Sequence, residues 1–214
     1  MWKNLIHIWK SDNLLEEAWN ESFDMLDTTY NMFEEASHIL RTGKKKALSK
    51  AIRKRDKRVN QYMQEVRRKV LTHCSVQGSE ELPGGLILAT IVIDIERLGD
   101  YTKNVLNIIN YNPEPLNAGK FTKKLDSIEK SVKDEFLQTK QCIEESDEEL
   151  SVIILKNTTD INTECESLIK ELVQEKDKSL SAGEAVTLTL YLRCLKRINS
   201  HLRNVLTSLT NPFD

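Results

Sequence analysis

Hydrophobic residues recur along most of this chain at alternating spacings of three and four positions. Between Asn13 and Gly43 the stripe has no gap, and its apolar or small members are Leu15, Trp19, Ser22, Leu26, Thr29, Phe33, Ala36 and Leu40. Such a stripe is typical of one face of an amphipathic helix. Glu16 follows Asn13 at the spacing of a capping box, and Gly43 is expected to end the helix. The pattern therefore predicts a long bundle helix.

Two further helices are predicted in the first half of the chain. A stripe over residues 48–70 predicts the second helix, although Asp56 takes one of its apolar places. Gly78 and the Pro-Gly-Gly run at 83–85 predict a loop after it. The third helix, 86–110, is apolar on nearly all sides at its start, so we expect it to be the most buried helix of its group.

The second half of the chain predicts three more helices. The Asn-Pro-Glu-Pro run at 112–115 stops the third helix and is the strongest linker signal in the sequence. A fourth helix is expected over 120–145, and capping boxes that begin at Ser146 and Ser181 open the fifth and sixth. With only 7 Gly and 4 Pro in 214 residues, long helices are favoured over a turn-rich β fold. The predicted fold class is all-α.

The two halves of the chain match each other at a separation of about 100 residues. Residues 95–106 (IERLGDYTKNVL) align with residues 195–206 (LKRINSHLRNVL), with identical Arg, Asn, Val and Leu. The paired Arg and Asn carry more weight than the apolar matches, because any two amphipathic helices share apolar spacing. We interpret the chain as two tandem three-helix bundles, residues 1–112 and 116–214, each burying its own core and packing on the other.

Four polar side chains lie at or beside the apolar stripes of the second and third helices. Glu96 and Asp100 are four residues apart, and so are Asp56 and Asn60. Side chains at i and i+4 share one side of a helix, so these oxygen atoms can face each other and hold a hard or borderline cation. Alternatively, Glu96 pairs with Arg97 or with an arginine of the second helix, and Asn60 is a hydrogen-bonded buried amide. Both interpretations stay open.

Other site chemistry finds little support. Glu35 and His38 form one Glu-x-x-His spacing, but a di-iron bundle needs a second one on another helix, and the sequence has none. A Gly-rich phosphate loop, a G-x-S-x-G elbow and an H-E-x-x-H motif are likewise missing from the sequence. The four cysteines stand singly, which predicts neither a zinc site nor a disulfide framework. We expect no catalysis.

Charge is strongly segregated along the chain, although the net charge is only −2. Residues 12–35 carry eight Asp and Glu and no Lys or Arg, whereas residues 41–69 carry thirteen Lys and Arg against two acids. Pairing between these neighbours and a surface for an acidic partner both agree with this pattern. Nucleic acid is not expected as a partner, because Tyr62 is the only aromatic residue in the basic segment and no DNA-binding motif accompanies it.

An apolar cluster stands at the start of the chain and consists of Trp2, Leu5, Ile6, Ile8 and Trp9. We expect it to pack on the end of the bundle, with membrane or partner contact as the alternative. No apolar run approaches the roughly 20 residues that span a bilayer, and the first residues lack the apolar stretch of a signal peptide. These observations predict a soluble, cytoplasmic protein.

The string at residues 94–105, DIERLGDYTKNV, resembles the D-L-E-R-I-G-D-x-x-x-N motif of the PhoU family of bacterial phosphate-signalling regulators. That family has two tandem three-helix repeats, so the resemblance extends over nearly the whole chain. It implies a peripheral protein that represses phosphate uptake and the phosphate regulon. The implied partners are a phosphate transporter component and a sensor histidine kinase, with membrane association only through them; a homodimer stays open.

The resemblance also implies a metal site, because some members bind iron or zinc on their acidic motifs. Its candidate ligands here are Glu96, Asp100, Asp56 and, weakly, Asn60, which replaces the second acid of the family's D-x-x-x-D pair. In the second repeat the corresponding positions carry no carboxylate; they are Thr158, Asn162, Lys196 and Ser200. Because a lysine repels a cation, the second site is expected to be lost. Three hypotheses remain: a regulatory adaptor, a metal-binding protein, and a scaffold for another membrane transporter.

Overall fold

The computed structural model describes residues 14–43, 46–77, 81–145 and 148–210, and every structural statement below concerns these residues. They form an all-α fold, which confirms the predicted class. A short 3-10 turn, η1 (Gly119–Phe121), precedes the fourth of the long helices. The long helices are α2 (Leu14–Thr42), α3 (Lys46–Gln77), α4 (Leu82–Tyr111), α5 (Thr122–Glu145), α6 (Glu148–Val173) and α7 (Ala182–Thr210).

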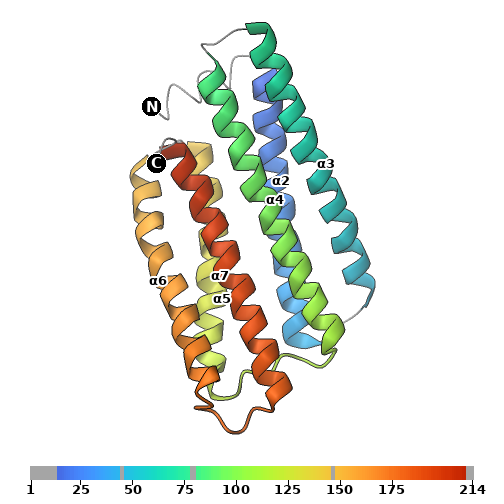
Figure 1. The fold of residues 1–214 in the computed structure, drawn as a ribbon, viewed down its shortest axis with the longest axis vertical. Coiled ribbons are helices and arrows are strands. Elements are labelled where there is room, and N and C mark those ends of the chain that lie inside the picture. Colours follow the sequence, from blue (N-terminus) through green and yellow to red (C-terminus); the bar gives the residue numbers. More distant parts are fainter. Residues whose placement is uncertain (1–13, 44–45, 78–80, 146–147, 211–214) are drawn as a thin grey trace.

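The helices form two groups of three that stand side by side (Figure 1). Helices α2, α3 and α4 pack on one another, as do α5, α6 and α7. The groups meet mainly through α4 and α7, which run antiparallel along the middle of the molecule, and also where α2 approaches α5 (Figure 1). This arrangement agrees with two packed three-helix units, while the limits 1–112 and 116–214 stay a prediction.

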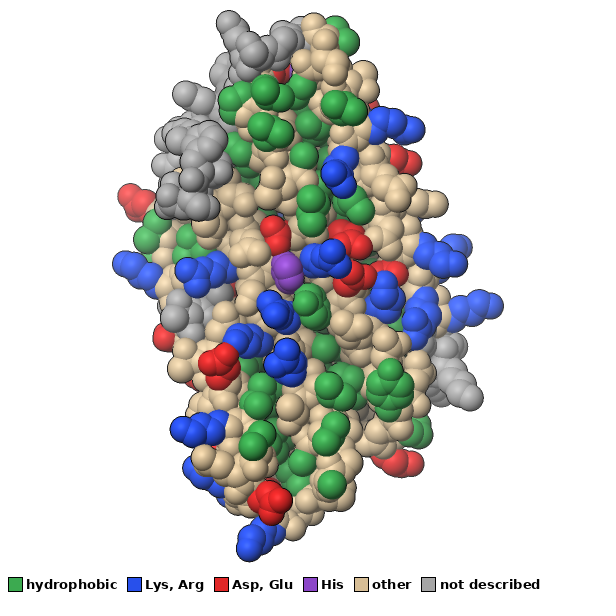
Figure 2. All heavy atoms as spheres, viewed as in Figure 1, with side chains coloured by type: hydrophobic (Ala, Val, Ile, Leu, Met, Phe, Trp, Pro, Cys, Tyr) green, Lys and Arg blue, Asp and Glu red, His purple; other side chains and the backbone are tan. Residues whose placement is uncertain are grey.

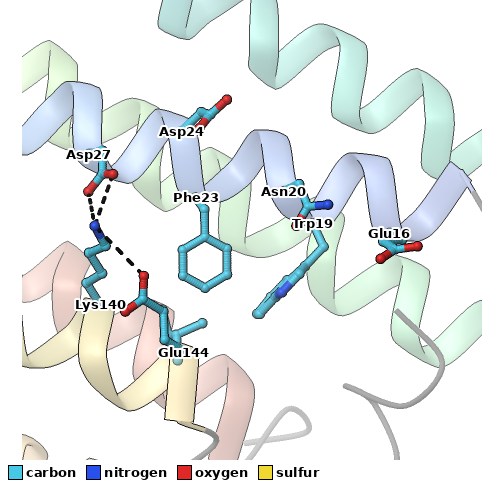
Figure 3. A pocket seen from close by; sticks show the side chains of 9 residues that line it. Glu16, Trp19, Asn20, Phe23, Asp24, Asp27, Lys140 and Glu144 are labelled. Carbon is cyan, nitrogen blue, oxygen red and sulfur yellow. Dashed lines mark hydrogen bonds and ion pairs between the residues drawn. The ribbon is translucent and has the colours of Figure 1, made fainter. Parts of the chain in front are cut away.

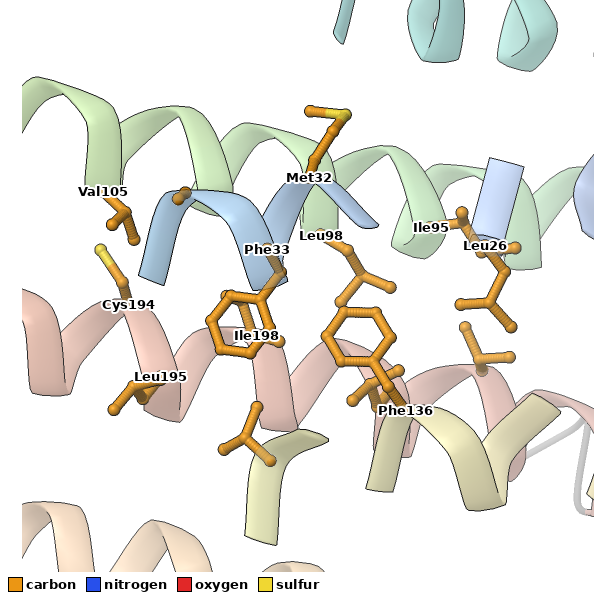
Figure 4. Close-up of a cluster of buried hydrophobic side chains, with 14 of the residues drawn as sticks. Leu26, Met32, Phe33, Ile95, Leu98, Val105, Phe136, Cys194, Leu195 and Ile198 are labelled. Atoms are coloured by element: carbon orange, nitrogen blue, oxygen red, sulfur yellow. The ribbon is translucent and has the colours of Figure 1, made fainter. Parts of the chain in front are cut away.

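The buried apolar residues of the two groups form one cluster to which all six long helices contribute. Figure 4 shows its centre, where Leu98 of α4 lies near Ile198 of α7. Phe33 of α2 stacks on Phe136 of α5, with ring centroids 5.7 Å apart and planes inclined by 23°. The repeats therefore share a core where they meet, in addition to the apolar stripes that each buries within itself.

Two of the predicted helix ends are confirmed. The Ser181 N–H donates to the Glu184 carboxylate over 2.7 Å, and the Glu184 N–H donates to Ser181 Oγ over 3.2 Å, which is the expected capping box. Gly43 has a φ of +69° and its N–H donates to the Ile39 carbonyl over 2.8 Å, so it ends α2 as predicted. The caps expected at Asn13 and Ser146, and the apolar cluster at residues 2–9, lie outside the described residues.

The Pro-Gly-Gly run at 83–85 is part of α4, so the prediction of a loop there is wrong. Helix α4 begins at Leu82, and Pro83 fits its first turn, where no backbone N–H partner is needed. A Cβ on Gly85 would lie 2.6 Å from Cys74 Sγ, so this glycine permits the close approach of α4 to α3. The sequence does not distinguish a glycine that permits close helix packing from a glycine in a loop, which explains the error.

The start of α4 is also less buried than its composition predicts. Ile87 and Leu88 lie in the core, but Leu82, Leu86 and Ile93 are exposed. Helix α4 contacts α2, α3 and α7, yet these three helices leave one edge of its first turns uncovered. None of the described helices has the length and apolarity needed to cross a membrane.

The predicted linker packs against the end of α2. The Leu116 N–H donates to the Leu40 carbonyl over 2.9 Å, and the side chain of Leu116 is buried. A Cβ on Gly43 would lie 3.1 Å from the Pro115 ring, so the glycine also leaves room for the proline. The connection between the repeats is thus held in place by backbone bonding and by close packing.

Candidate functional site

The structure brings together three of the four predicted site residues, around a lysine that the sequence argument did not consider. Asp56 of α3 is buried, and Glu96 and Asp100 of α4 are half-buried beside it. The Lys103 Nζ donates to Asp56 Oδ2 over 3.1 Å and to Asp100 Oδ1 over 2.8 Å. Arg97 Nη1 donates to Asp100 Oδ2 over 2.9 Å. The acidic groups are therefore members of an ion-pair network.

The surroundings shift the pKa values of two members of this network, Glu96 and Lys103. Burial, and then the charge of Asp100, raise the pKa of Glu96, while Arg97 at 3.8 Å acts in the opposite direction. Burial lowers the pKa of Lys103, but its hydrogen bonds to Asp100 and Asp56 outweigh this and raise it. The fold thus stabilises the charge of Lys103 and disfavours the charge of Glu96. The alternative pairing of Glu96 with Arg97 is present, although it is long.

Asn60, the fourth predicted ligand, lies half-buried on α3 and has no hydrogen bond to the three carboxylates among the described residues. Nor is any set of three or more His, Cys, Asp and Glu side chains in this part of the chain arranged to hold a metal ion. The Lys103 ammonium stands between Asp56 and Asp100, where a divalent cation would have to bind. As arranged, the donor set does not fit iron or zinc, and the ligand assignment stays a prediction that requires Lys103 to move.

The second repeat replaces the ion pairs with neutral hydrogen bonds. Asn199 Nδ2 donates to Asn162 Oδ1 over 3.2 Å, and Asn162 Nδ2 donates to Ser200 Oγ over 3.3 Å. Lys196, at the position of Glu96, instead pairs with Glu166 of α6. These amide and hydroxyl groups bond one another, and Lys196 and Ser200 stand where the first repeat has Glu96 and Asp100, so the equivalent positions offer no carboxylate to a cation. The side chain of Thr158 lies outside the described residues.

Acidic α2 and basic α3 pair with each other, as one of the two interpretations of their charges predicts. Arg55 Nη2 is 2.6 Å from Glu35 Oε2, and Lys69 Nζ is 2.7 Å from Glu21 Oε1. Glu35 is therefore engaged with an arginine, while His38 is exposed near the end of α2. Pairing is incomplete, however, because several cations on the outer face of α3 contact no carboxylate of the described chain: Lys50, Lys54, Lys57, Arg67 and Arg68.

A hollow of about 660 Å³ lies where α2 meets α5 (Figure 3). Lys140 Nζ is 2.8 Å from Asp27 Oδ1 and 3.8 Å from Glu144 Oε1, so an ion pair between the two repeats closes one end. Trp19 and Phe23 lie beside it with ring centroids 5.1 Å apart at 84°. Sequence reasoning missed this hollow because Asp27 and Lys140 are 113 positions apart.

A second hollow, which we call the α3–α4 groove, has a volume of about 490 Å³. Leu71 and Leu86 on its two sides are 70% and 58% exposed. Figure 2 shows hydrophobic side chains gathered over this end of α3 and α4. A contiguous exposed apolar surface is typical of protein interaction sites. The lining residues are Gln64, Arg67, Arg68, Val70, Leu71, Cys74, Leu82, Leu86 and Ala89.

Part of the first repeat matches a known protein family. Residues 23–109, which include most of α2, all of α3 and nearly all of α4, match the family model of the PhoU domain. Residues 23–109 form a PhoU domain. The resemblance seen in residues 94–105 is thereby confirmed, and the PhoU match ends before the second repeat, where neutral side chains replace the acidic set.

Solved structures extend the PhoU likeness to the whole fold. The chain is similar to PhoU from Pseudomonas aeruginosa, with a TM-score of 0.83 and 18% identity over 93% of this chain and 98% of that one. It is also similar to the phosphate transport system regulatory protein PhoU from Streptococcus pneumoniae, with a TM-score of 0.80 and 14% identity over 92% and 95% of the two chains. At these identities the likeness shows the fold. No curated protein sequence matches the chain significantly.

Proposed function

We propose that this chain is a regulatory adaptor of phosphate transport and phosphate-responsive signalling. It acts by contact with a membrane phosphate transporter component, a sensor histidine kinase, or both. The observation that carries the proposal is the PhoU domain at residues 23–109. The relative of the same fold from Streptococcus pneumoniae, a phosphate transport system regulatory protein, supports it.

The α3–α4 groove is the surface that we assign to this contact. Its leucines are exposed to water in the isolated chain, so covering them with a partner is favourable by about 25 cal/mol for each Å² of apolar surface removed from water. Arg67 and Arg68 lie beside them and contact no carboxylate of the described chain. An apolar centre with cations at its edge favours a partner that combines apolar side chains with acidic ones.

A pull-down from native membranes, in cells grown at high and low phosphate, tests the adaptor. The wild-type chain is expected to recover a phosphate transporter component or a sensor kinase. Leu71→Ser with Leu86→Ser should reduce this recovery by about tenfold or more, as loss of central apolar contacts does. The matched control is Val152→Ser with Ile153→Ser, since these α6 side chains are similarly exposed at 48% and 56% but lie outside the groove.

Each outcome of the pull-down addresses one part of the proposal. Recovery of neither partner at either phosphate level contradicts the adaptor. Recovery of an unrelated transporter instead supports a scaffold for that transporter. Equal recovery by all three proteins contradicts only the assignment of the α3–α4 groove.

Metal binding at Asp56, Glu96 and Asp100 is a second candidate function, favoured by the convergence of these carboxylates from two helices and requiring Lys103 to leave its place between Asp56 and Asp100. The test is elemental analysis of the purified chain together with Glu96→Ala combined with Asp100→Ala. Stoichiometric iron or zinc that the double variant loses supports a metal function. Lys103→Met extends the test, because removal of the ammonium should raise metal content if the three carboxylates are ligands.

A further inference from the structure

The seam between α4 and α7 contains two equivalent locations, because the helices run antiparallel (Figure 1) and carry the matching repeats. At one location Asp94 Oδ1 accepts hydrogen bonds from His201 Nδ1 over 2.7 Å and from Asn204 Nδ2 over 3.0 Å. The two repeats align at a separation of 100 positions. The residues equivalent to Asp94, His201 and Asn204 are therefore Cys194, Tyr101 and Asn104, respectively. All three line one hollow of about 330 Å³, which we call the α4–α7 groove.

The α4–α7 groove lacks the carboxylate that its counterpart has. Cys194 stands at the place of Asp94, and burial raises the pKa of this thiol to about 12, so it carries no charge at neutral pH. The first location is filled by bonds among protein side chains. The second keeps an open space and leaves the Asn104 amide exposed beside it.

Cations lie at this groove without acids to neutralise them. Arg193 and Arg197 are exposed one turn apart on α7, and no carboxylate of the described chain contacts either. The counterpart of Arg197 is Arg97, which is bonded to Asp100 over 2.9 Å. In the second repeat a serine, Ser200, takes the place of that aspartate. Arg197 therefore has no aspartate at the equivalent position in the described chain and is available to an acceptor from a ligand.

Further donors and a flat apolar wall complete the groove. Arg53 Nη2 donates to Asn107 Oδ1 over 3.0 Å. Because this bond uses the oxygen of the Asn107 amide, the Nδ2 group of Asn107 is available to donate to a ligand. Among the described residues that line the groove there is no Asp or Glu. Tyr111, also on the lining, is 77% exposed, and Leu190 lies beside it on α7. Figure 2 shows basic side chains near the middle of this face and hydrophobic ones below them.

We propose that the α4–α7 groove binds a small organic phosphate that carries a flat ring, of which a nucleoside monophosphate is the simplest example. Its phosphate takes the role that Asp94 has in the equivalent location and accepts from Asn104, Arg193 and Arg197. Guanidinium groups bind phosphate oxygens with two parallel hydrogen bonds, which favours phosphate at a pair of arginines. The ring stacks on Tyr111, as bases do on aromatic side chains.

The size of the groove agrees with such a ligand. A volume of about 330 Å³ lies at the lower end of the range for small-molecule sites, about 300 to 1,000 Å³. This favours a mononucleotide over a dinucleotide. The α4–α7 groove shares no lining residue with the α3–α4 groove, so a failure of this proposal would leave the adaptor proposal untouched, and the reverse also holds.

Calorimetric titration of the full chain with AMP, adenosine and inorganic phosphate tests the proposal. AMP is expected to bind, and adenosine and phosphate alone should each bind at least about tenfold more weakly, because each lacks one half of the contacts. Arg197→Gln should weaken AMP binding by about tenfold or more, as loss of a charge-assisted hydrogen bond does. Arg203→Gln is the matched control, an exposed cation of the same helix outside the groove lining, and should leave the affinity unchanged.

A second variant tests the equivalence of the two locations. Cys194→Asp places a carboxylate at the counterpart of Asp94, where it should bond to Asn104 and abolish AMP binding, whereas Cys194→Ser should retain it. Circular dichroism confirms that each protein is folded, and if Cys194→Asp does not fold, Arg197→Gln alone decides. The proposal is overturned if wild type does not bind AMP at millimolar concentration, or if Arg203→Gln weakens binding as much as Arg197→Gln. Phosphate that binds as tightly as AMP overturns the role of the ring.

Discussion

Two carboxyl groups on α4, those of Glu96 and Asp100, differ in how closely cations neutralise their charge. Asp100 is bonded by Arg97 and Lys103, both within 3 Å, whereas the ion pair of Glu96 within the described part of the chain is the longer contact to Arg97. Burial and the nearby Asp100 charge raise the pKa of Glu96. A raised carboxyl pKa means that the native state binds this proton more tightly than the unfolded chain does. Native stability therefore decreases as the pH rises through the ordinary value of 4.5 towards the raised folded value.

We predict that Glu96→Gln increases the melting temperature at pH 7, because the amide removes a charge that the fold disfavours. The increase should shrink as the pH falls from the raised folded value towards 4.5, because Glu96 of the native wild type then becomes protonated and loses the charge that the fold disfavours. Thermal unfolding at pH 7 and pH 4 measures the difference. Glu171→Gln is the control of opposite sign, because the hydrogen bond from Lys124 lowers the pKa of Glu171. A lower melting temperature for Glu96→Gln at pH 7 contradicts the prediction.

A glycine at a helix contact offers a second prediction at this scale. Gly85→Ala places a methyl group 2.6 Å from Cys74 Sγ, so we expect a loss of about 1–3 kcal/mol in the free energy of unfolding. Gly183→Ala is the matched control, because no atom lies within 4 Å of its Cβ position. The control should be neutral or gain up to about 1 kcal/mol from helix propensity. Urea unfolding compares the two, and equal effects would rule out the packing explanation.

Whole helices depend on how their ends are satisfied. At the start of α7, Ser181 and Glu184 bond each other's backbone N–H groups, so two of the donors that a helix leaves open find partners. The end of α2 uses Gly43 in a left-handed conformation, which residues with a side chain rarely adopt. These helix caps are made by residues close in sequence, so they set the helix ends without contacts from distant parts of the chain.

We predict that Ser181→Ala lowers the free energy of unfolding by about 1 kcal/mol, the usual cost of losing an N-terminal cap. Ser127→Ala, an exposed position inside α5, should be neutral or slightly stabilising, because alanine favours the helix interior. Chemical denaturation of both variants gives the comparison. If Ser181→Ala costs no more than Ser127→Ala, the cap contributes nothing measurable.

Local signals explain why some elements could be predicted and others could not. The stripe of α2 and the box at Ser181 depend on neighbours in sequence, so both could be read from the chain. Gly85 was misread because its reason is Cys74, a residue of another helix. The convergence of Asp56 with Glu96 and Asp100 followed from helix spacing. That Lys103 would turn towards them instead of towards solvent depends on the packing of α3 on α4, which the spacing does not contain.

The molecule as a whole is joined along α4 and α7. Its buried residues form one cluster, and polar bonds such as that of Asp94 with His201 connect the repeats at the surface of the seam. Domains that share a core unfold together, because exposing the interface of one removes support from the other. We therefore expect a single unfolding transition for both repeats.

We predict that Asp94→Ala lowers the free energy of unfolding by about 1–3 kcal/mol, because His201 and Asn204 lose their common acceptor. All three tryptophans precede residue 20, and Trp19 is buried on α2, so tryptophan fluorescence follows the N-terminal part of the chain, whereas circular dichroism follows all helices. The two transitions should coincide in wild type and shift together in the variant. Asp24→Ala, an exposed α2 position, should leave both in place. Separate transitions in wild type would show that the repeats fold independently.

The unequal repeats have a consequence for stoichiometry. Two identical units packed through antiparallel helices would present every surface twice, and a partner could bind either copy. Here the cluster of Asp56, Glu96 and Asp100 belongs to the first repeat, and the network of Asn162, Asn199 and Ser200 to the second. The α4–α7 groove beside Cys194 is open, whereas the equivalent location at Asp94 is occupied by hydrogen-bonded side chains. The two repeats are therefore not interchangeable. Within the described chain, a partner that recognises one of these features has a single binding site. Complexes with a dimeric target would then need two copies of this protein to occupy both sites.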